Sequence, residues 1–254
     1  MLTLTTAQCS HRGGRASNED ALGSRVRDND GCFVISDGVG GQAGGAFASK
    51  LAVHWALQQL DDKQSYGLQA MTHGSVDAAD AAIVAEQRRN PERSRMAATM
   101  VALFVDRRER MAQWIHVGDS RLYLFRRGYL LRRTQDHSLA AQLQQAGLSC
   151  SPDKAHLLSH ALGQADTDTI EPGAACTLED GDAYLLCTDG FWNGLDDAAM
   201  HRCLQVAGNV ADWITLLAEQ VRRRSDGDGT QDNYSALGVW VGDPQLVTRA
   251  HGIL

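Results

Sequence analysis

The sequence has no long apolar run and few prolines. No apolar stretch in the 254 residues approaches the roughly 20 residues that cross a bilayer. The first residues, MLTLTTAQCS, also lack the basic and apolar regions of a signal peptide. We therefore expect a cytoplasmic protein with no membrane partner. With only four prolines against 25 glycines, backbone freedom is expected mainly in turns.

Two further absences concern partners and redox chemistry. A net charge of -7 and a pI near 5.7 leave no basic surplus, which disfavours nucleic acid as a partner. No cysteine pair has the CxxC or zinc-ligand spacing, so free thiols are expected rather than disulfides or a zinc site. The six cysteines are Cys9, Cys32, Cys150, Cys176, Cys187 and Cys203.

The composition is that of one globular domain. Hydrophobic residues make up 43% of the chain and charged residues 22%, which is enough for one large core at this length. No linker or repeat divides the sequence. We expect a single catalytic domain over residues 1–242, a C-terminal tail over 243–254, and a monomer.

Strand and helix patterns alternate irregularly along the chain. Short runs rich in β-formers, bounded by turn residues, predict strands at 31–38, 97–106, 111–119, 121–128, 182–190 and 233–242. Apolar residues at helical spacing predict helices at 43–60, 75–89, 138–147 and 209–224. The segments 104–115 and 123–133 read as hairpins. The order predicts an α+β fold in which helices cover stacked antiparallel sheets.

The stretch CSHRGGRASNED, residues 9–20, allows two phosphate chemistries. The spacing from Cys9 to Arg15 is that of a thiolate nucleophile beneath a phosphate-binding arginine. Alternatively, Arg15 with Glu19 and Asp20 suits an arginine beside a metal site. A reactive thiolate needs a loop that leads into a helix, whereas the residues after Arg15 read as turn and strand. We interpret Cys9 as a strand residue, and a cysteine-dependent phosphatase using Cys9 stays open as an alternative.

A glycine-rich segment imitates a dinucleotide-binding fingerprint. Gly38, Gly40 and Ala43 follow a strand and open a helix, and the acidic Asp61 and Asp62 come about 20 residues later. A dinucleotide fold needs a second parallel strand ending at that acid, and the sequence runs from helix directly into Asp61. We therefore disfavour a nucleotide site here.

Five aspartates stand at predicted strand ends or turns: Asp20, Asp37, Asp119, Asp189 and Asp232. A single Asp-Gly is usually only a turn. Carboxylates that converge would repel one another unless a cation lies between them. Ligand sets made only of oxygen select hard ions such as Mg²⁺ or Mn²⁺.

The motifs RASNED, SDGVGG, HVGDSRLYL, QDHS, HALG, CTDGFWN and QDNYS follow one another in that order. In this series the sequence resembles the metal-dependent Ser/Thr protein phosphatases of the type 2C class, in their short single-domain bacterial form. The resemblance extends from about Thr5 to Val241. It implies a four-layer α-β-β-α sandwich, with two central antiparallel sheets flanked by helices and a dinuclear metal site at one end.

The resemblance also implies the ligands of that site. Asp37 would bridge two Mn²⁺ or Mg²⁺ ions and the Gly38 carbonyl would bind one of them. Asp189 and Asp232 would complete the protein ligands, and Asp119 would bind a possible third, weaker ion.

Three further residues take roles from the same resemblance. Glu19 and Asp20 match residues that hold metal-bound waters, and Arg15 matches the phosphate-binding arginine. Phosphate-monoester hydrolysis is too slow without catalysis for one general base to suffice. Two ions would supply a bridging hydroxide for in-line attack, with no covalent intermediate. The substrates would be phosphoserine and phosphothreonine proteins, produced by a cognate bacterial Ser/Thr kinase.

Some positions depart from the family pattern. Val39 stands where many eukaryotic members have a histidine, so no imidazole is available there to protonate the leaving oxygen. We interpret His137 as a structural hydrogen-bonding residue, and His156 and His160 as surface or flap residues. A non-catalytic phosphoprotein-binding module of the same fold is a second alternative, which loss of the core carboxylates would favour, and all of them are present.

Overall fold

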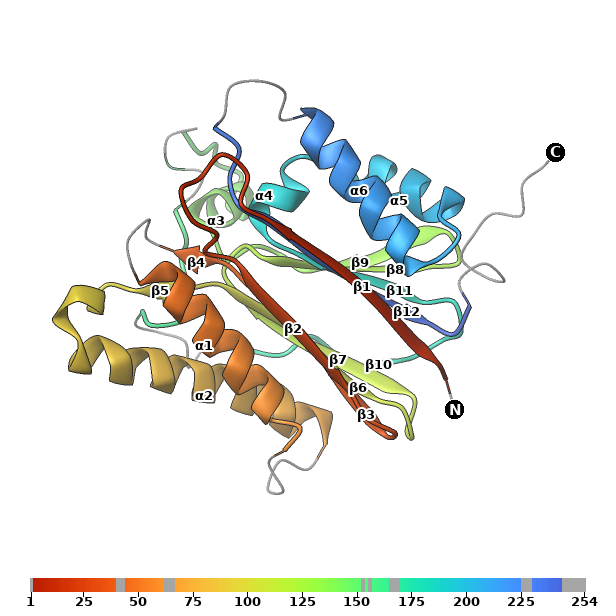
Figure 1. Ribbon diagram of the computed structural model, residues 1–254, viewed down its shortest axis with the longest axis horizontal. Helices are drawn as coiled ribbons and strands as arrows, with labels where there is room; N and C mark the ends of the chain where they lie inside the picture. The colour runs from red at the N-terminus through yellow and green to blue at the C-terminus, as the bar shows by residue number, and fades with distance from the viewer. Residues whose placement is uncertain are drawn as a thin grey trace.

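The computed structural model describes residues 2–39, 44–61, 67–151, 154, 157–164, 170–224 and 230–243. Two antiparallel sheets are stacked in the middle of the molecule, with a pair of long helices on each outer side (Figure 1). The predicted four-layer α-β-β-α sandwich is therefore confirmed. No helix of these described residues is long and apolar enough to cross a membrane.

The first sheet contains both the first and the last strand of the chain. It runs β1 (Leu4–His11), β12 (Tyr234–Val241), β11 (Ala183–Cys187), β8 (Arg121–Arg126) and β9 (Tyr129–Arg133). Its outer face is covered by α5 (Asp197–Val206) and α6 (Val210–Arg224). The pairing of β8 with β9 confirms the second predicted hairpin.

The second sheet runs β10 (Cys176–Thr177), β7 (Met111–Val117), β6 (Met100–Asp106), β3 (Asp30–Ser36) and β2 (Ala21–Val26). The outer face of this sheet packs on α1 (Gly45–Gln58), and α2 (Leu68–Arg89) packs beside α1 (Figure 1). The pairing of β6 with β7 confirms the first predicted hairpin.

Apolar side chains fill all three spaces between the layers. In β3, Cys32 and Val34 pack toward the helices α1 and α2, whereas Phe33 and Ile35 pack between the two sheets. Successive side chains of a strand point to opposite faces, so a strand buried on both faces has a continuous apolar run. On the other side of the molecule, Trp213 meets Phe125 edge to face at 5.9 Å.

The structure differs from the predicted elements in several places, among them the predicted strand 97–106, which is divided at Thr99. Helix α2 begins at Leu68 and not at residue 75. The prediction missed its first two turns because Thr72 and Gly74 are both weak helix formers. Strand β11 ends at Cys187, and the short helix α4 (Asp189–Trp192) follows it. Helix α5 was not predicted, although its N-cap, Asp196, accepts the Ala199 N–H at 2.6 Å.

Several short elements gather at one end of the sandwich (Figure 1). There β4 (Gly38–Val39) pairs with β5 (Ala97–Ala98), close to α3 (Leu139–Gln145), α4 and the loop that joins β1 to β2. The 3-10 turn η1 (Pro91–Arg93) joins α2 to β5. The N-terminus lies at the opposite end (Figure 1). The ends of several strands therefore meet at one place, which is where the predicted aspartates stand.

Candidate active site

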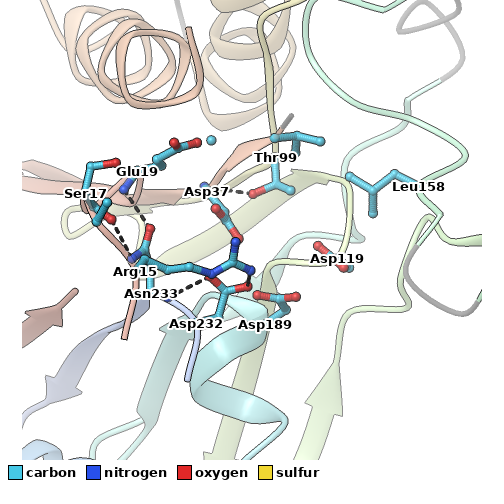
Figure 2. A pocket seen from close by; sticks show the side chains of 13 residues that line it. Arg15, Ser17, Glu19, Asp37, Thr99, Asp119, Leu158, Asp189, Asp232 and Asn233 are labelled. Atoms are coloured by element: carbon cyan, nitrogen blue, oxygen red, sulfur yellow. Dashed lines mark hydrogen bonds and ion pairs between the residues drawn. The ribbon is translucent and has the colours of Figure 1, made fainter. Parts of the chain in front are cut away.

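A cavity of about 360 Å³ opens at this end of the sandwich. Figure 2 shows carboxylates from separate elements around it, with Leu158 on one side and Glu19 on the other. The acidic and basic residues that line it are Arg15, Glu19, Asp37, Asp119, Asp189 and Asp232. Thus all but one of the predicted site side chains line one cavity, and the remaining one, Asp20, lies directly behind it.

Asp37 lies between β3 and β4 and is held through its backbone. Its N–H donates to Thr99 Oγ1 at 2.9 Å, and the Thr99 N–H donates back to the Asp37 carbonyl at 2.8 Å. Thr99 Oγ1 also shares a 2.7 Å hydrogen bond with Ser120 Oγ, and both hydroxyls are buried. Thr99 and Ser120 therefore fix the position of the central carboxylate.

Gly38 can lie here only because it has no side chain. A Cβ at this position would collide with the backbone of Gly45, at the start of α1. The Gly38 N–H donates to the Glu19 carbonyl at 3.2 Å, and Gly38 pairs with Ala98. The close approach of β4 to α1 therefore requires glycine and places the Gly38 backbone on the cavity wall.

Asp20 is buried, and its two carboxylate oxygens differ in their hydrogen bonding. Its Oδ2 accepts hydrogen bonds from Ser235 Oγ at 2.6 Å and Thr188 Oγ1 at 3.0 Å, whereas no N–H or O–H donor from the described residues reaches Oδ1. The Asp20 carboxyl lies within hydrogen-bonding reach of Asp37, and burial raises the pKa of Asp20 to about 6. A buried carboxylate oxygen without a donor is costly in the absence of a cation.

The carboxylates disfavour one another's ionisation. Burial raises the pKa of Asp37 well above its ordinary value, and the charges of Asp20, Asp189, Asp119 and Asp232 raise it further. Burial, followed by the charge of Asp189, raises the pKa of Asp119 to about 7. All these groups can be charged together near neutral pH only if cations offset them.

The donor set fits hard divalent ions. It consists of carboxylate and backbone carbonyl oxygens, the ligands that Mg²⁺ and Mn²⁺ prefer. Among the described residues, no three His, Cys, Asp or Glu side chains in their present conformations converge closely enough to bind one metal ion. Asp232 is instead ion-paired with Arg15. Ion binding therefore requires side-chain adjustment within a cluster whose backbone positions are already set.

The segment 15–20 is tied to the far end of the chain by Asn233. The Glu19 N–H donates to Asn233 Oδ1 at 2.8 Å, and Asn233 Nδ2 donates to the carbonyls of Arg12 at 2.8 Å and Ser17 at 2.9 Å. Burial raises the pKa of Glu19, and the nearby Arg15 charge opposes that rise. Asn233 is thus a positioning residue that the sequence motif contained but did not single out.

Asp119 is held from the opposite side of the cavity. Trp192 Nε1–H donates to the Asp119 carbonyl at 2.9 Å. The guanidinium of Arg121 stacks on the Trp192 ring at 3.3 Å and makes two 2.7 Å hydrogen bonds to Asp136. Because Trp192 belongs to the helix that begins at Asp189, this contact links the Asp119 and Asp189 walls.

Arg15 lies at the mouth of the cavity. Its Nη2 donates to Asp232 Oδ2 at 2.7 Å, and the two side chains are 55% and 42% exposed. A planar guanidinium in this position can grip two oxygens of a phosphate.

Cys9 takes no part in the cavity. It pairs with Ala236 in the first sheet, and its side chain packs against the apolar cluster beneath α6. Burial raises the pKa of its thiol to about 11. A protonated thiol on another face of the sheet cannot act as the nucleophile, so the strand interpretation of Cys9 is confirmed.

Other sequence candidates also have structural places. His137 stacks on His116 at 4.3 Å and meets His160 edge-on at 5.2 Å, so His137 and His160 belong to one ring cluster. Val39 lines the cavity, and it offers no imidazole there. His156 lies outside the described residues.

The glycine-rich fingerprint is only partly described. Gly40, Ala43 and Asp62 lie outside the described residues, as does the tail from 244 to 254. Asp61 forms ion pairs with Arg25 and Arg27, so it has a structural role at the end of α1.

Comparisons with known proteins agree on one family. The model of the family described as Protein phosphatase 2C matches residues 7–228. The serine/threonine protein phosphatase PstP of Mycobacterium tuberculosis is 35% identical over 248 residues, which cover 93% of this chain and 45% of that protein. The chain thus spans less than half of that relative. The serine/threonine phosphatase stp of Listeria monocytogenes is 25% identical over 88% of this chain and 90% of its own length.

Solved structures show the same fold. The catalytic domain of PstP, in a crystal structure with two manganese ions, superposes with a TM-score of 0.80 at 31% identity. The superposition covers 96% of this chain and 100% of that chain. A serine/threonine phosphatase of S. agalactiae superposes with a TM-score of 0.79 at 23% identity, over 94% of this chain and 99% of that one.

Proposed function

The chain belongs to the protein phosphatase 2C family, and from that premise we propose that it is a metal-dependent phosphatase of phosphoserine and phosphothreonine in proteins. The observation that carries the proposal is the group of carboxylates around Asp37, with Arg15 at the mouth of the same cavity. Hydrolysis of a phosphate ester needs charge neutralisation and a bound phosphoryl group, and this cavity contains side chains suited to both.

We propose that Asp37, the Gly38 carbonyl, Asp189 and Asp232 hold two divalent ions. Their oxygen chemistry supports Mn²⁺ or Mg²⁺, and the related PstP domain contains manganese. When bound, such ions lower the pKa of water and offset the charge of the phosphoryl group. Asp119, whose backbone is held by Trp192, is proposed as the ligand of a third ion.

The remaining side chains bind and orient. Arg15 holds the phosphoryl oxygens. This fixes the side of the phosphorus from which water attacks and the opposite side on which the alcohol leaves. Asp20 and Glu19 accept hydrogen bonds from ordered water behind the ion ligands. Since Val39 cannot donate a proton to the leaving oxygen, that proton comes from water in the open cavity.

The substrates are proposed to be proteins phosphorylated by a Ser/Thr kinase that this enzyme opposes. Four further points stay predictions: a catalytic domain spanning residues 1–242, a monomeric state, a signalling role and a cytoplasmic location. The non-catalytic module is disfavoured because each of the carboxylates that it would be expected to lack is present.

The proposal is tested by phosphate release from a phosphothreonine peptide by the purified chain in Mn²⁺. Cys9→Ser should retain most of the turnover and should change mainly stability, because the side chain packs between β1 and α6. Rapid acid quench should trap no phosphoenzyme. A phosphorylated Cys9, or no phosphate release from any phosphopeptide, would overturn the proposal.

A further inference from the structure

A second cavity, of about 620 Å³, opens beside the active site. Val39 lines both cavities, so they adjoin at β4. The walls of the second cavity come from the start of α1, from residues 91–97 and from Gly163 and Gln164. We call this second cavity the groove, and nothing in the proposed catalytic chemistry uses it.

The groove is built on fixed backbone. Gln87 Nε2 donates to the carbonyls of Met96 at 2.7 Å and Gly163 at 2.8 Å. The Gly163 N–H in turn donates to Asp80 Oδ1 at 2.7 Å. The groove wall at Met96 and the wall at Gly163 are therefore joined through one side chain of α2, Gln87, which fixes these two walls relative to each other.

Three charged residues of the described part of the chain line the groove, and they differ in what holds them. Arg93 is committed to structure, since it pairs with Glu86 at 2.7 Å and lies over the Phe47 ring at 4.1 Å. Arg95 is exposed and forms no ion pair with the described residues. Glu92, also exposed, is the one acid of the lining among the residues that the structure describes. Arg95 is thus a cation available to a ligand.

Arg95 stands at a defined separation from the reaction centre. It precedes Ala97 by two residues, and Ala97 pairs with Val39, the neighbour of Gly38. Arg95 lies in the turn before β5, so Cα steps of at most about 3.8 Å and a strand spacing of about 4.8 Å place its backbone within roughly 15 Å of Gly38, and its long side chain can shorten the remaining gap to roughly 10 Å. An extended peptide covers that distance in about two to four residues.

We propose that this groove receives the substrate chain beside the phosphorylated residue, and that Arg95 selects an anionic side chain two to four positions away. The anion is a carboxylate or a second phosphate, since a guanidinium binds either. The net charge of -7 disfavours acidic substrates in general, and a cation on the groove wall offsets this repulsion locally. The inference rests on the proposed phosphatase function.

The test compares phosphothreonine peptides that differ at one position. Peptides with alanine, glutamate or a non-hydrolysable phosphonate analogue of phosphoserine at each of positions two to four on either side are assayed for kcat/KM, and the last two separate the carboxylate and phosphate sources. At least one acidic position should raise kcat/KM about 2- to 5-fold over alanine, which is the size expected for an exposed charge pair. The preference should shrink at high salt.

Variants then assign the preference to Arg95. Arg95→Ala should abolish it, Arg95→Glu should invert it and Arg95→Lys should keep part of it, while all three hydrolyse p-nitrophenyl phosphate at the wild-type rate. The control is Arg89→Ala, an exposed arginine at the end of α2 that does not line the groove. An unchanged acidic preference in Arg95→Ala, or an equal loss in Arg89→Ala, would overturn the inference.

Failure of the proposed function gives a different result. If the wild-type protein hydrolyses neither p-nitrophenyl phosphate nor any peptide, the phosphatase proposal fails. Fluorescence anisotropy of the acidic and alanine peptides then decides the groove independently. Tighter binding of the acidic peptide that is lost in Arg95→Ala supports the groove, and equal binding of the two peptides contradicts it.

Discussion

Arg15 Nη2 donates to Asp232 Oδ2 at 2.7 Å across the mouth of the active-site cavity. The proposed phosphate-binding group and a proposed ion ligand are therefore in direct contact, although 217 positions separate them in the chain. Both side chains are about half-exposed, so the pair contributes little to folding, about 0–1 kcal/mol. A phosphate and an ion can separate them at small cost.

Arg15→Ala should therefore impair substrate binding without emptying the ion site. The loss of a charged hydrogen bond of about 1.5–3 kcal/mol corresponds to roughly a 10- to 100-fold fall in kcat/KM for a phosphopeptide. KM should rise, and kcat should also fall if the guanidinium binds the transition state more tightly. Metal content, measured on the same sample, should match the wild type; a loss of metal equal to the loss of activity would contradict the assigned role.

Two aspartates on facing walls should differ in severity. Asp189→Asn should abolish turnover, because Asp189 is proposed as a ligand of the central ion pair. Asp119→Asn should leave measurable activity and lower the affinity for a third ion, which a titration of rate against Mn²⁺ would show. Equal loss in both variants with unchanged metal stoichiometry would refute this ranking.

Thr99 should matter because it positions Asp37. Thr99→Val removes a buried hydroxyl that accepts the Asp37 N–H and bonds Ser120, so the free energy of unfolding should fall by about 1–3 kcal/mol. Urea denaturation measures this change. We expect kcat to fall more than KM rises, since Asp37 would be held less exactly. Thr99→Ser keeps the hydroxyl and is the matched control; if it behaves like valine, the hydroxyl is not the cause.

His137 should make the fold sensitive to acid. Burial, followed by the charges of His116 and His160, lowers the pKa of His137 to about 4, whereas an unfolded histidine titrates near 6.5. The contribution of His137 to the stability of the fold is therefore fully present above about pH 6.5. It is lost as the pH falls toward 4, because the unfolded chain takes up the proton first.

His137→Gln cannot titrate and tests that contribution. In chelator, the drop in Tm between pH 7.5 and pH 5 should be smaller in His137→Gln than in the wild type. Comparing the two proteins at each pH cancels the titration of the other groups. Equal drops in both proteins would show that His137 does not carry the acid sensitivity.

The sequence allowed the carboxylates of the site to be predicted because each leaves a local signal. Asp37 follows the buried strand β3 directly, and Asp189 and Asp119 each stand two residues after the end of a buried strand, β11 and β7. Strand ends of stacked sheets meet at the edge of a sandwich, so their order alone brings these residues together. The family resemblance then supplied their roles, which no local pattern contains.

The residues that hold the carboxylates could not be predicted in the same way. Thr99 reads as one more β-former in a strand, and its partner Asp37 is 62 positions away. Asn233 bridges to Glu19 across 214 positions. Such contacts depend on the packing of distant segments, and only the folded structure shows them. Arg95 is a surface arginine in the sequence, and it gains interest only from the groove that it lines.

The ion dependence of the reaction tests the central claim most directly. After chelation, phosphate release from a phosphothreonine peptide should stop, and Mn²⁺ should restore it more than Ca²⁺, which prefers looser coordination and is a weaker Lewis acid. Asp37→Asn, with the wild-type circular dichroism spectrum, should bind the ions weakly and stay inactive at Mn²⁺ concentrations that saturate the wild type. Full activity of the wild type in chelator would contradict the account.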